Sequence, residues 1–507
     1  MQWGKRRKVT GQGLSYVVSS TLLAAVGFPP NMSRRDVRTS SIDRSIWLDL
    51  SQETFRQHLV VLEDRTNAVP IDARAFDPEE WLSISPYAAQ SSYSLPLAIE
   101  QQLADDFACL VAVEEGAQSV AAVCIEEHIL PPGLTLRFAA LDILLDDTVR
   151  TVLQRATAIM ATIASDSAKG AHFVPDYVDN LFHSVIQLHH RRLLAQLRST
   201  KWEKPKHLFK SHKKALWQDF TNLLHRVQFY YIKKEKPLRH AVEKSLVGLA
   251  SVYEGFEAVP LASEAEVPAL KHVVDTSFTF CSTDTIKDFT QRLESRAGAT
   301  PTKQVASAIK SLRQIQKIAS YRQICVSLAE TARNYPALFQ NKIEIAYLAP
   351  FKSMPTTIGY EEWAKTCHVH AEVQLALHYD LLSQLEAGHP SFLRPRTIGI
   401  SKWLCYLCYH FLKAHGQFFP SKTHGRLYDQ WTIPDLAEFT TETYQRYRSI
   451  IKAIDDEVLR QTDNEPELWR VEPMTSVNCH FLSSEARFVR CGRSPLVRQV
   501  RSQECDR

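Results

Sequence analysis

The sequence lacks three features that define large classes of proteins. After residue 36 no apolar run is long enough to cross a bilayer as a helix, so we expect no membrane contact. There is no internal repeat and no long low-complexity tract. The ten cysteines form no dense framework, and most stand singly within apolar segments. This distribution disfavours a disulfide-stapled secreted domain and favours a reducing, intracellular compartment.

Acidic residues are absent before Asp36, where a basic cluster, Lys5 to Lys8, precedes a mostly apolar stretch, Leu14 to Phe28. This layout is similar to that of a signal or transit peptide. Hydroxyl side chains interrupt the stretch, however, and no clean cleavage site of small residues follows. We expect a cytoplasmic or nuclear protein, with export or organelle import as the alternative.

A chain of 507 residues exceeds the size at which one hydrophobic core stops growing, so about two to four domains are expected. The hydrophobic pattern changes near Asn341, from mainly helical periodicity to alternation of strands and helices. The predicted fold is an α/β domain preceded by a mostly α-helical domain. Its divisions are a basic and apolar extension, 1–36; a helical region, 37–335; the α/β domain, 336–450; and a terminal helix with a loose tail, 451–507.

Positive charge is concentrated in one segment of a chain whose net charge is only +4. Residues 191–244 carry fifteen Lys and Arg against four acidic residues. Aromatic residues interleave these charges, as on a surface that binds single-stranded nucleic acid. The alternative, and the more common arrangement, is a pair of amphipathic helices with their aromatic side chains in the core and their lysines in solvent.

The α/β domain has a readable order of elements. The alternating stretch "KIEIAYLAP" predicts a strand, and a helix is predicted from about Glu361 to Ala387. A short strand is predicted at 396–400, followed by a helix that Ser401 opens and Gly416 closes. Earlier, "SVAAVCIEE" and "LTLRFAAL" predict a small sheet element within the helical region. Strands alternating with helices indicate a layered α/β domain.

His370 and Glu372 stand two residues apart, a spacing that places side chains on nearly opposite faces of a helix. They can share a site only at the end of the helix. A metal over the first turn could take His370 as a ligand while Glu372 reaches a water molecule on that metal.

Cys405 and Cys408 stand three residues apart, on one face near the start of the second predicted helix. The positive end of the helix dipole lowers cysteine pKa and so favours the thiolates that zinc requires. One histidine and two cysteines leave the fourth position of a zinc ion open for water, which is the mark of a catalytic site. A nearby carboxylate could then move the proton of that water.

The order His370-Ala371-Glu372, a strand, then Cys405-Tyr406-Leu407-Cys408 resembles the zinc-dependent cytidine-deaminase-like superfamily. The stretches "CHVHAEVQLALHY", "IGISKWLCYLCYHFL" and "THGRLYDQWTIP" are similar in particular to a mainly fungal family of nucleic acid or nucleotide deaminases. One departure is Leu404, which stands where the superfamily usually has proline, and we expect Ser401 to cap the helix instead.

The resemblance implies a cytidine-deaminase-like three-layer fold for 336–450. It implies a hydrolase in which His370, Cys405 and Cys408 hold Zn²⁺ and Glu372 moves protons. The reaction would remove the exocyclic amine of cytosine or adenine by attack of a zinc-activated water. The substrate would be a nucleotide or a single-stranded nucleic acid.

Two other interpretations remain open from the residues alone. Cys367 stands three residues before His370, so Cys367, His370, Cys405 and Cys408 could form a closed structural zinc site in a catalytically silent interaction protein. Alternatively, the chain is a nucleic-acid-binding module centred on 191–244.

The stretch "THGRLYDQW" also has two interpretations. His424 could form a hydrogen bond with a base on which Trp431 stacks. The alternative is a polar turn followed by a buried tryptophan.

Overall fold

The computed structural model describes residues 44–84, 92–113, 120–141, 146–170, 175–204, 214–296, 301–385 and 391–464. The predicted N-terminal extension, 1–36, and the tail beyond 464 lie outside these residues.

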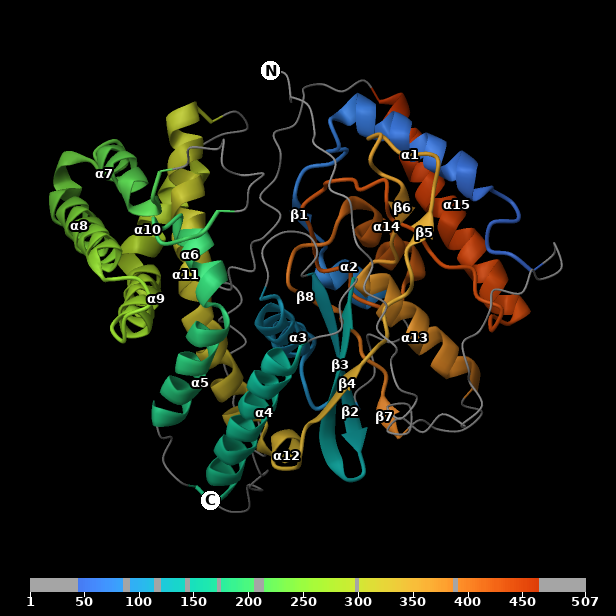
Figure 1. Cartoon of the computed structure of the whole chain (residues 1–507), viewed down its shortest axis with the longest axis horizontal. Coiled ribbons are helices and arrows are strands. Elements are labelled where there is room, and N and C mark those ends of the chain that lie inside the picture. Colours follow the sequence, from blue (N-terminus) through green and yellow to red (C-terminus); the bar gives the residue numbers. More distant parts are fainter. Residues whose placement is uncertain are drawn as a thin grey trace, which may run out of the picture.

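A mixed five-stranded sheet forms the centre of the molecule (Figure 1). β2 (Ala121–Ile129) and β3 (Pro132–Ala140) pair as an antiparallel hairpin, and β4 (Glu344–Tyr347) adds to β3 in parallel. Along the other edge of β2 lie β7 (Phe392–Leu393) and β8 (Gly399–Ile400), both antiparallel to it.

The hairpin is buried on both faces, because alternate residues of β2 point into different cores. Val123 and Ile125 belong to one core, and Ala122 and Cys124 belong to the other. A continuous apolar run is typical of a strand with both faces covered. The sequence placed this hairpin in a small sheet element of the helical region, but it is the middle of the main sheet. The strands therefore come from both sides of residue 336, the predicted domain boundary.

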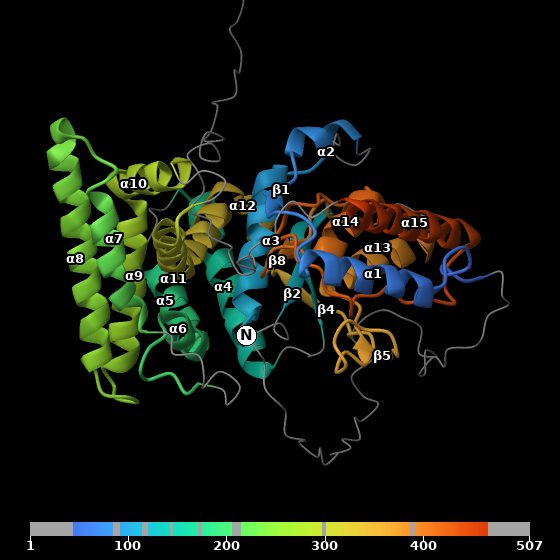
Figure 2. The same cartoon turned by 90° about the horizontal axis from the view of Figure 1, so that it is seen from above.

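Helices cover both faces of the sheet (Figures 1 and 2). On one side lies a helical block whose members share a continuous core with β2 and β3: α3 (Leu97–Val111), α4 (Asp147–Ala168), α5 (Pro175–Leu188), α6 (His190–Leu197), α7 (Phe220–Val227), α8 (Lys236–Ala258), α9 (Glu266–Ser282), α10 (Asp284–Ser295), α11 (Lys303–Asn334) and α12 (Pro336–Phe339). The short 3-10 turns η2 (Leu216–Asp219) and η3 (Lys233–Glu235) connect parts of this block.

On the other side lie α1 (Gln52–Thr66), α13 (Ala371–Leu385), α14 (Tyr406–His415) and α15 (Thr441–Asp463). α1 packs against α15, so the two ends of the described chain meet here (Figure 2). Shorter elements border this layer: β1 (Arg74–Ala75), which pairs with β9 (Lys422–Thr423); α2 (Pro78–Ile84); and β5 (Met354–Pro355), which pairs with β6 (Thr366–Cys367).

Two predicted helix starts are wrong. The first helix begins at Ala371 rather than Glu361, because Thr366 and Cys367 pair with β5 and the His368 N–H donates to the Gln430 carbonyl at 2.7 Å. The second begins at Tyr406, and Ser401 does not cap it. The hydroxyl of Ser401 instead accepts the Ala121 N–H at 3.2 Å, which fixes the β8 end to β2.

The basic segment 191–244 runs through α6, η2, α7 and the start of α8. Tyr230 and Tyr231 are buried, and Trp202 and Trp217 pack against the same core, whereas Phe229 is 57% exposed. Phe209 lies outside the described residues. This placement agrees with amphipathic helices, and nucleic-acid contact by this segment stays a prediction. Within the described part of the chain, no helix combines the length and apolarity that a membrane span requires.

Asp380 holds the layer of α13, α14 and α15 together. Its buried carboxylate contacts His415 of α14 at 2.9 Å, accepts the Tyr447 hydroxyl of α15 at 2.8 Å, and pairs with Arg394 at 2.8 Å and Arg446 at 3.3 Å. Burial alone would raise the pKa of Asp380, but His415 and the two guanidinium groups outweigh it and hold that pKa well below its usual range.

We expect Asp380→Asn to destabilise the fold by about 3 kcal/mol at neutral pH, because it leaves the partly buried guanidinium groups of Arg394 and Arg446 without their anionic partner. The depressed folded-state pKa means that this stabilisation is complete above the unfolded pKa of about 3.9 and is lost as the pH falls below it. Urea denaturation between pH 7 and pH 2 should therefore show the two proteins converging below about pH 4. Asp456→Asn, at an exposed acid paired with Lys452, is the control and should differ little from wild type at any pH.

Candidate metal centre and active site

His370, Cys405 and Cys408 form a group that could hold a metal ion. His370 directly precedes α13, Cys405 is the N-cap of α14, and Cys408 lies in the first turn of α14. The His370 Nδ1 lies 3.6 Å from the Sγ of Cys405 and 3.4 Å from the Sγ of Cys408, and one ligand atom from each residue lies within 4.8 Å of the others.

These separations suit a tetrahedral ion. With Zn–S bonds of about 2.3 Å and Zn–N bonds of about 2.0 Å, tetrahedral geometry places nitrogen and sulfur about 3.5 Å apart. The two observed nitrogen–sulfur distances fall on either side of that value. One nitrogen and two sulfur ligands also favour zinc, because magnesium and calcium prefer oxygen ligands.

The start of α14 explains how both sulfurs come to face one point. The Cys408 N–H donates to the Cys405 Sγ at 3.3 Å, so a sulfur takes the place of the usual capping oxygen. Leu404 directly precedes the N-cap residue Cys405, and its backbone N–H donates to the Lys422 carbonyl at 3.0 Å. Proline has no such N–H, which gives a physical reason for leucine at this position.

The two thiols differ in acidity. Burial would raise the pKa of Cys405, but hydrogen bonding from Cys408 and the proximity of His370 outweigh it and lower that pKa well below the usual value. Burial, together with the neighbouring Cys405 and Glu372, raises the pKa of Cys408. The positive charge of a bound metal ion would favour the thiolate of Cys408.

Glu372 lies in the first turn of α13 and is 3% exposed. Its Oε2 lies 3.5 Å from the Cys408 Sγ, so the carboxylate borders the metal group at the start of the helix. Burial raises the pKa of Glu372, with His370 opposing the shift and Cys405 adding to it. A carboxyl group with a raised pKa beside a metal site is suited to accept and return a proton.

A pocket of about 720 Å³, including its mouth, opens onto the group. Besides His370, Glu372 and Cys405, its lining includes Lys402, Trp403, His424, Tyr428 and Gln430. The sequence alone indicated no role for Lys402, Trp403, Tyr428 or Gln430, although all four lie inside or beside the motifs quoted above. Their proximity to "CYLC" and "THG" was the available signal.

His424 has a defined orientation at the pocket. Its Nδ1 accepts the Arg426 N–H at 3.0 Å, which leaves the ring proton on Nε2. Trp431, by contrast, is fully buried, packs against Phe411 and Phe55, and does not line the pocket. The base-stacking role considered for Trp431 is therefore wrong, and the alternative of a buried tryptophan is correct.

Gly425 fixes the loop that carries His424. Its φ is +75°, and a Cβ built there would lie 2.0 Å from the Ile71 carbonyl oxygen, which belongs to the N-terminal segment. We expect Gly425→Ala to lower the melting temperature by several degrees, because it combines backbone strain with a backbone clash. Gly416→Ala is the matched control, since Gly416 has a φ of +74° but nothing within 4 Å of the added carbon. An equal decrease in melting temperature in the two variants would contradict a clash between the added carbon and the Ile71 carbonyl.

Cys367 is not a member of the metal group. It lies in β6, where burial raises its pKa and Arg56 and Thr356 are its neighbours. The closed four-ligand alternative assumed that Cys367 and His370 share a helix face. That assumption is wrong, because the helix begins only after His370.

The comparison with protein families agrees with this geometry. Residues 369–435 match a family model described as an OTT_1508-like deaminase. The matched segment contains His370, Glu372, Cys405, Cys408 and His424. No curated protein and no solved structure matches the chain. The chain thus contains a deaminase-like domain whose matched segment holds the metal-binding group and its neighbouring carboxylate.

Proposed function

We propose that the protein is a zinc-dependent hydrolytic deaminase of the cytidine-deaminase-like superfamily that acts on cytosine or adenine in a nucleotide or nucleic acid. One observation carries the proposal: the Glu372 carboxylate borders the His370, Cys405 and Cys408 group at a pocket, within a segment that matches a deaminase family.

His370, Cys405 and Cys408 would hold the zinc ion. Bound zinc would lower the pKa of a water molecule to about 7. Glu372 would accept one proton from that water and deliver it to the ring nitrogen. It would then carry the second proton, from the added hydroxyl, to the exocyclic amine. Water adds to the ring carbon, ammonia leaves, and a carbonyl replaces the amine.

The remaining pocket residues would select the base. The Nε2–H of His424 would donate to an acceptor on the base, and the rings of Tyr428 and Trp403 offer faces for stacking. Lys402 adds positive charge to the same lining, which favours a substrate that carries phosphate.

The test is ammonia release by zinc-loaded protein from cytosine and adenine substrates, each offered as nucleoside, nucleotide, single-stranded DNA and RNA. We expect release from at least one substrate, with a product about one mass unit heavier, as replacement of an amine by a carbonyl requires. Folded, zinc-loaded protein that acts on none of these substrates would oppose the proposal and favour a catalytically silent interaction protein.

A further inference from the structure

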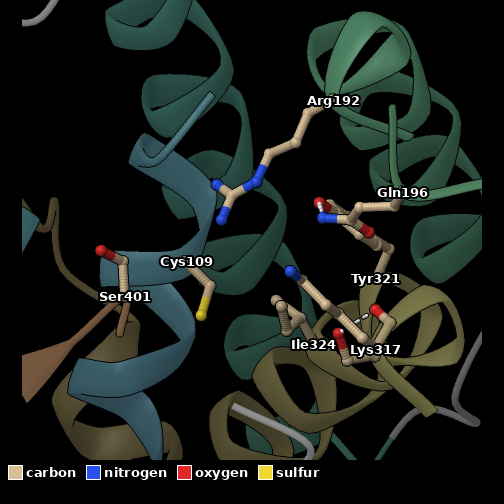
Figure 3. Close-up of a pocket in the computed structure, with 8 residues that line it drawn as sticks. Cys109, Arg192, Gln196, Lys317, Tyr321, Ile324 and Ser401 are labelled. Carbon is tan, nitrogen blue, oxygen red and sulfur yellow. Dashed lines mark hydrogen bonds between the residues drawn. The ribbon is translucent and has the colours of Figure 1, made fainter. Parts of the chain in front are cut away.

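A second pocket lies beside the segment that leads to the metal centre. Ser401 contributes to its wall, and the next residue, Lys402, lines the metal pocket. The other walls come from α3, α6 and α11, so helical block and sheet meet here (Figure 3). Its volume is about 350 Å³ including the mouth, which suits one small group rather than a whole nucleotide.

Two cations from different helices point into this second pocket. Arg192 comes from α6 and Lys317 from α11, and their charged ends face the same space (Figure 3). Among the described residues that line the pocket, none carries an acidic side chain. Two like charges in a partly enclosed space repel each other, and an anion between them removes that repulsion.

The positive charge of Arg192 contributes to lowered pKa values of two neighbouring groups. Burial and the charge of Arg192 lower the pKa of Lys402 to about 8. The same two causes lower the pKa of the buried His189 to about 3. Both shifts indicate that additional positive charge is unfavourable near Arg192. A site with such a positive potential attracts an anion.

Gln196 and Tyr321 add a neutral hydrogen-bond donor to the wall. Both are more than nine-tenths buried, and the Gln196 Nε2 donates to the Tyr321 hydroxyl at 3.0 Å. That arrangement leaves the tyrosine hydrogen to donate elsewhere. If the oxygen and nitrogen of the Gln196 amide exchange places, the Tyr321 hydroxyl donates to the amide oxygen. An amide N–H of Gln196 is then available to donate elsewhere. Either orientation supplies one further donor.

We propose that this second pocket is a phosphate-binding site, with Arg192 and Lys317 as the charged ligands and the Gln196–Tyr321 pair as a neutral donor. A guanidinium fork, an ammonium and a hydroxyl match the several oxygens of a phosphate better than the two of a carboxylate. A bound phosphate would connect α6 and α11 to the segment before Cys405. The site goes beyond the proposed deaminase and does not depend on it.

Binding is tested with inorganic phosphate on the full-length, metal-loaded protein, by calorimetry and by thermal melting. Sodium chloride at matched ionic strength is the reference. We expect phosphate to raise the melting temperature of wild type above the chloride value. Arg192→Gln and Lys317→Gln should each weaken phosphate binding by about tenfold or more, because each removes a charge-assisted contact. Arg192→Lys keeps a charge and should retain part of the affinity.

The matched controls are Arg191→Gln and Lys310→Gln, which remove exposed cations from the same two helices. Both should bind phosphate as wild type does. No phosphate effect beyond that of chloride would overturn the proposal. So would affinity that survives the double Arg192→Gln, Lys317→Gln variant, provided that circular dichroism shows it folded.

The source of the phosphate is decided by a separate comparison. If it belongs to the substrate, Arg192→Gln should raise the KM for a nucleotide and leave the KM for the matching nucleoside unchanged. If it is a free phosphate compound, the variant should affect both substrates alike, and inorganic phosphate should not compete with the nucleotide. Should no substrate be deaminated at all, the phosphate titration still decides whether the site exists.

Discussion

The Glu372→Gln protein should retain its zinc and its melting temperature but release ammonia at least about 10²-fold more slowly than wild type. The reason is geometric and chemical. Glu372 is buried at the edge of the metal group, so its carboxylate can exchange protons with a water molecule there, whereas the amide of glutamine cannot. Glutamine has nearly the same size, and the packing of the first turn of α13 is therefore preserved.

The measurement is single-turnover ammonia release with the best substrate of the panel, accompanied by zinc analysis of each preparation. Glu362→Gln, at an exposed position outside the pocket, is the control for loss of one negative charge. A Glu372→Gln protein as active as wild type would remove Glu372 from proton transfer. Activity lost together with zinc would instead assign the residue a structural role.

Cys405→Ala and Cys408→Ala should each lose zinc. Residues that merely support a metal ligand cost about 10- to 100-fold in affinity when replaced, so removal of a ligand itself should exceed about 100-fold. Stability should fall as well, because a metal held by His370 and the two cysteines at the start of α14 would bind only the folded state. Zinc content after dialysis against a weak chelator, and melting with and without added zinc, measure the two effects.

Cys367→Ala is the matched control, since it removes an equally buried thiol outside the metal group. It should keep about one zinc per chain, as the three-ligand site requires. If this variant lost its metal as completely as Cys405→Ala, the site would be a closed structural one. The deaminase proposal would then lack an open coordination position.

Much of the candidate site could be predicted from the sequence, because its chemistry lies in short motifs. His370, Glu372, Cys405 and Cys408 lie at two helix starts. The spacing of His370 and Glu372 limited a shared site to the end of a helix, and the order of the motifs added the two cysteines. For His424, the sequence offered a place at the pocket as one of two interpretations, and the structure places it in the pocket lining. Trp431 could not be decided, because a tryptophan in a polar turn has the same local sequence whether it packs inward or faces a base.

The fold was less predictable, because its main determinants are contacts between distant residues. The apolar run in β2 indicates a buried strand, but nothing near it shows that its partner at β8 lies beyond residue 390. The helix predicted from Glu361 was similarly displaced by pairing with β5, an interaction that its own periodicity does not contain. The second pocket could not be predicted from the sequence for the same reason, since Arg192, Lys317 and Ser401 come from three separate parts of the chain.

The long connection between β3 and β4 has a consequence for how the chain folds. Ala122 of β2 pairs with Ile400 of β8, so the sheet cannot be completed during synthesis until the helices between them have emerged. Those helices make mainly local contacts and can form early, whereas closure of so large a loop carries an entropic cost that grows with its length. The hairpin of β2 and β3 should therefore keep exposed strand edges until then, and closure of the sheet should be the slow step of folding.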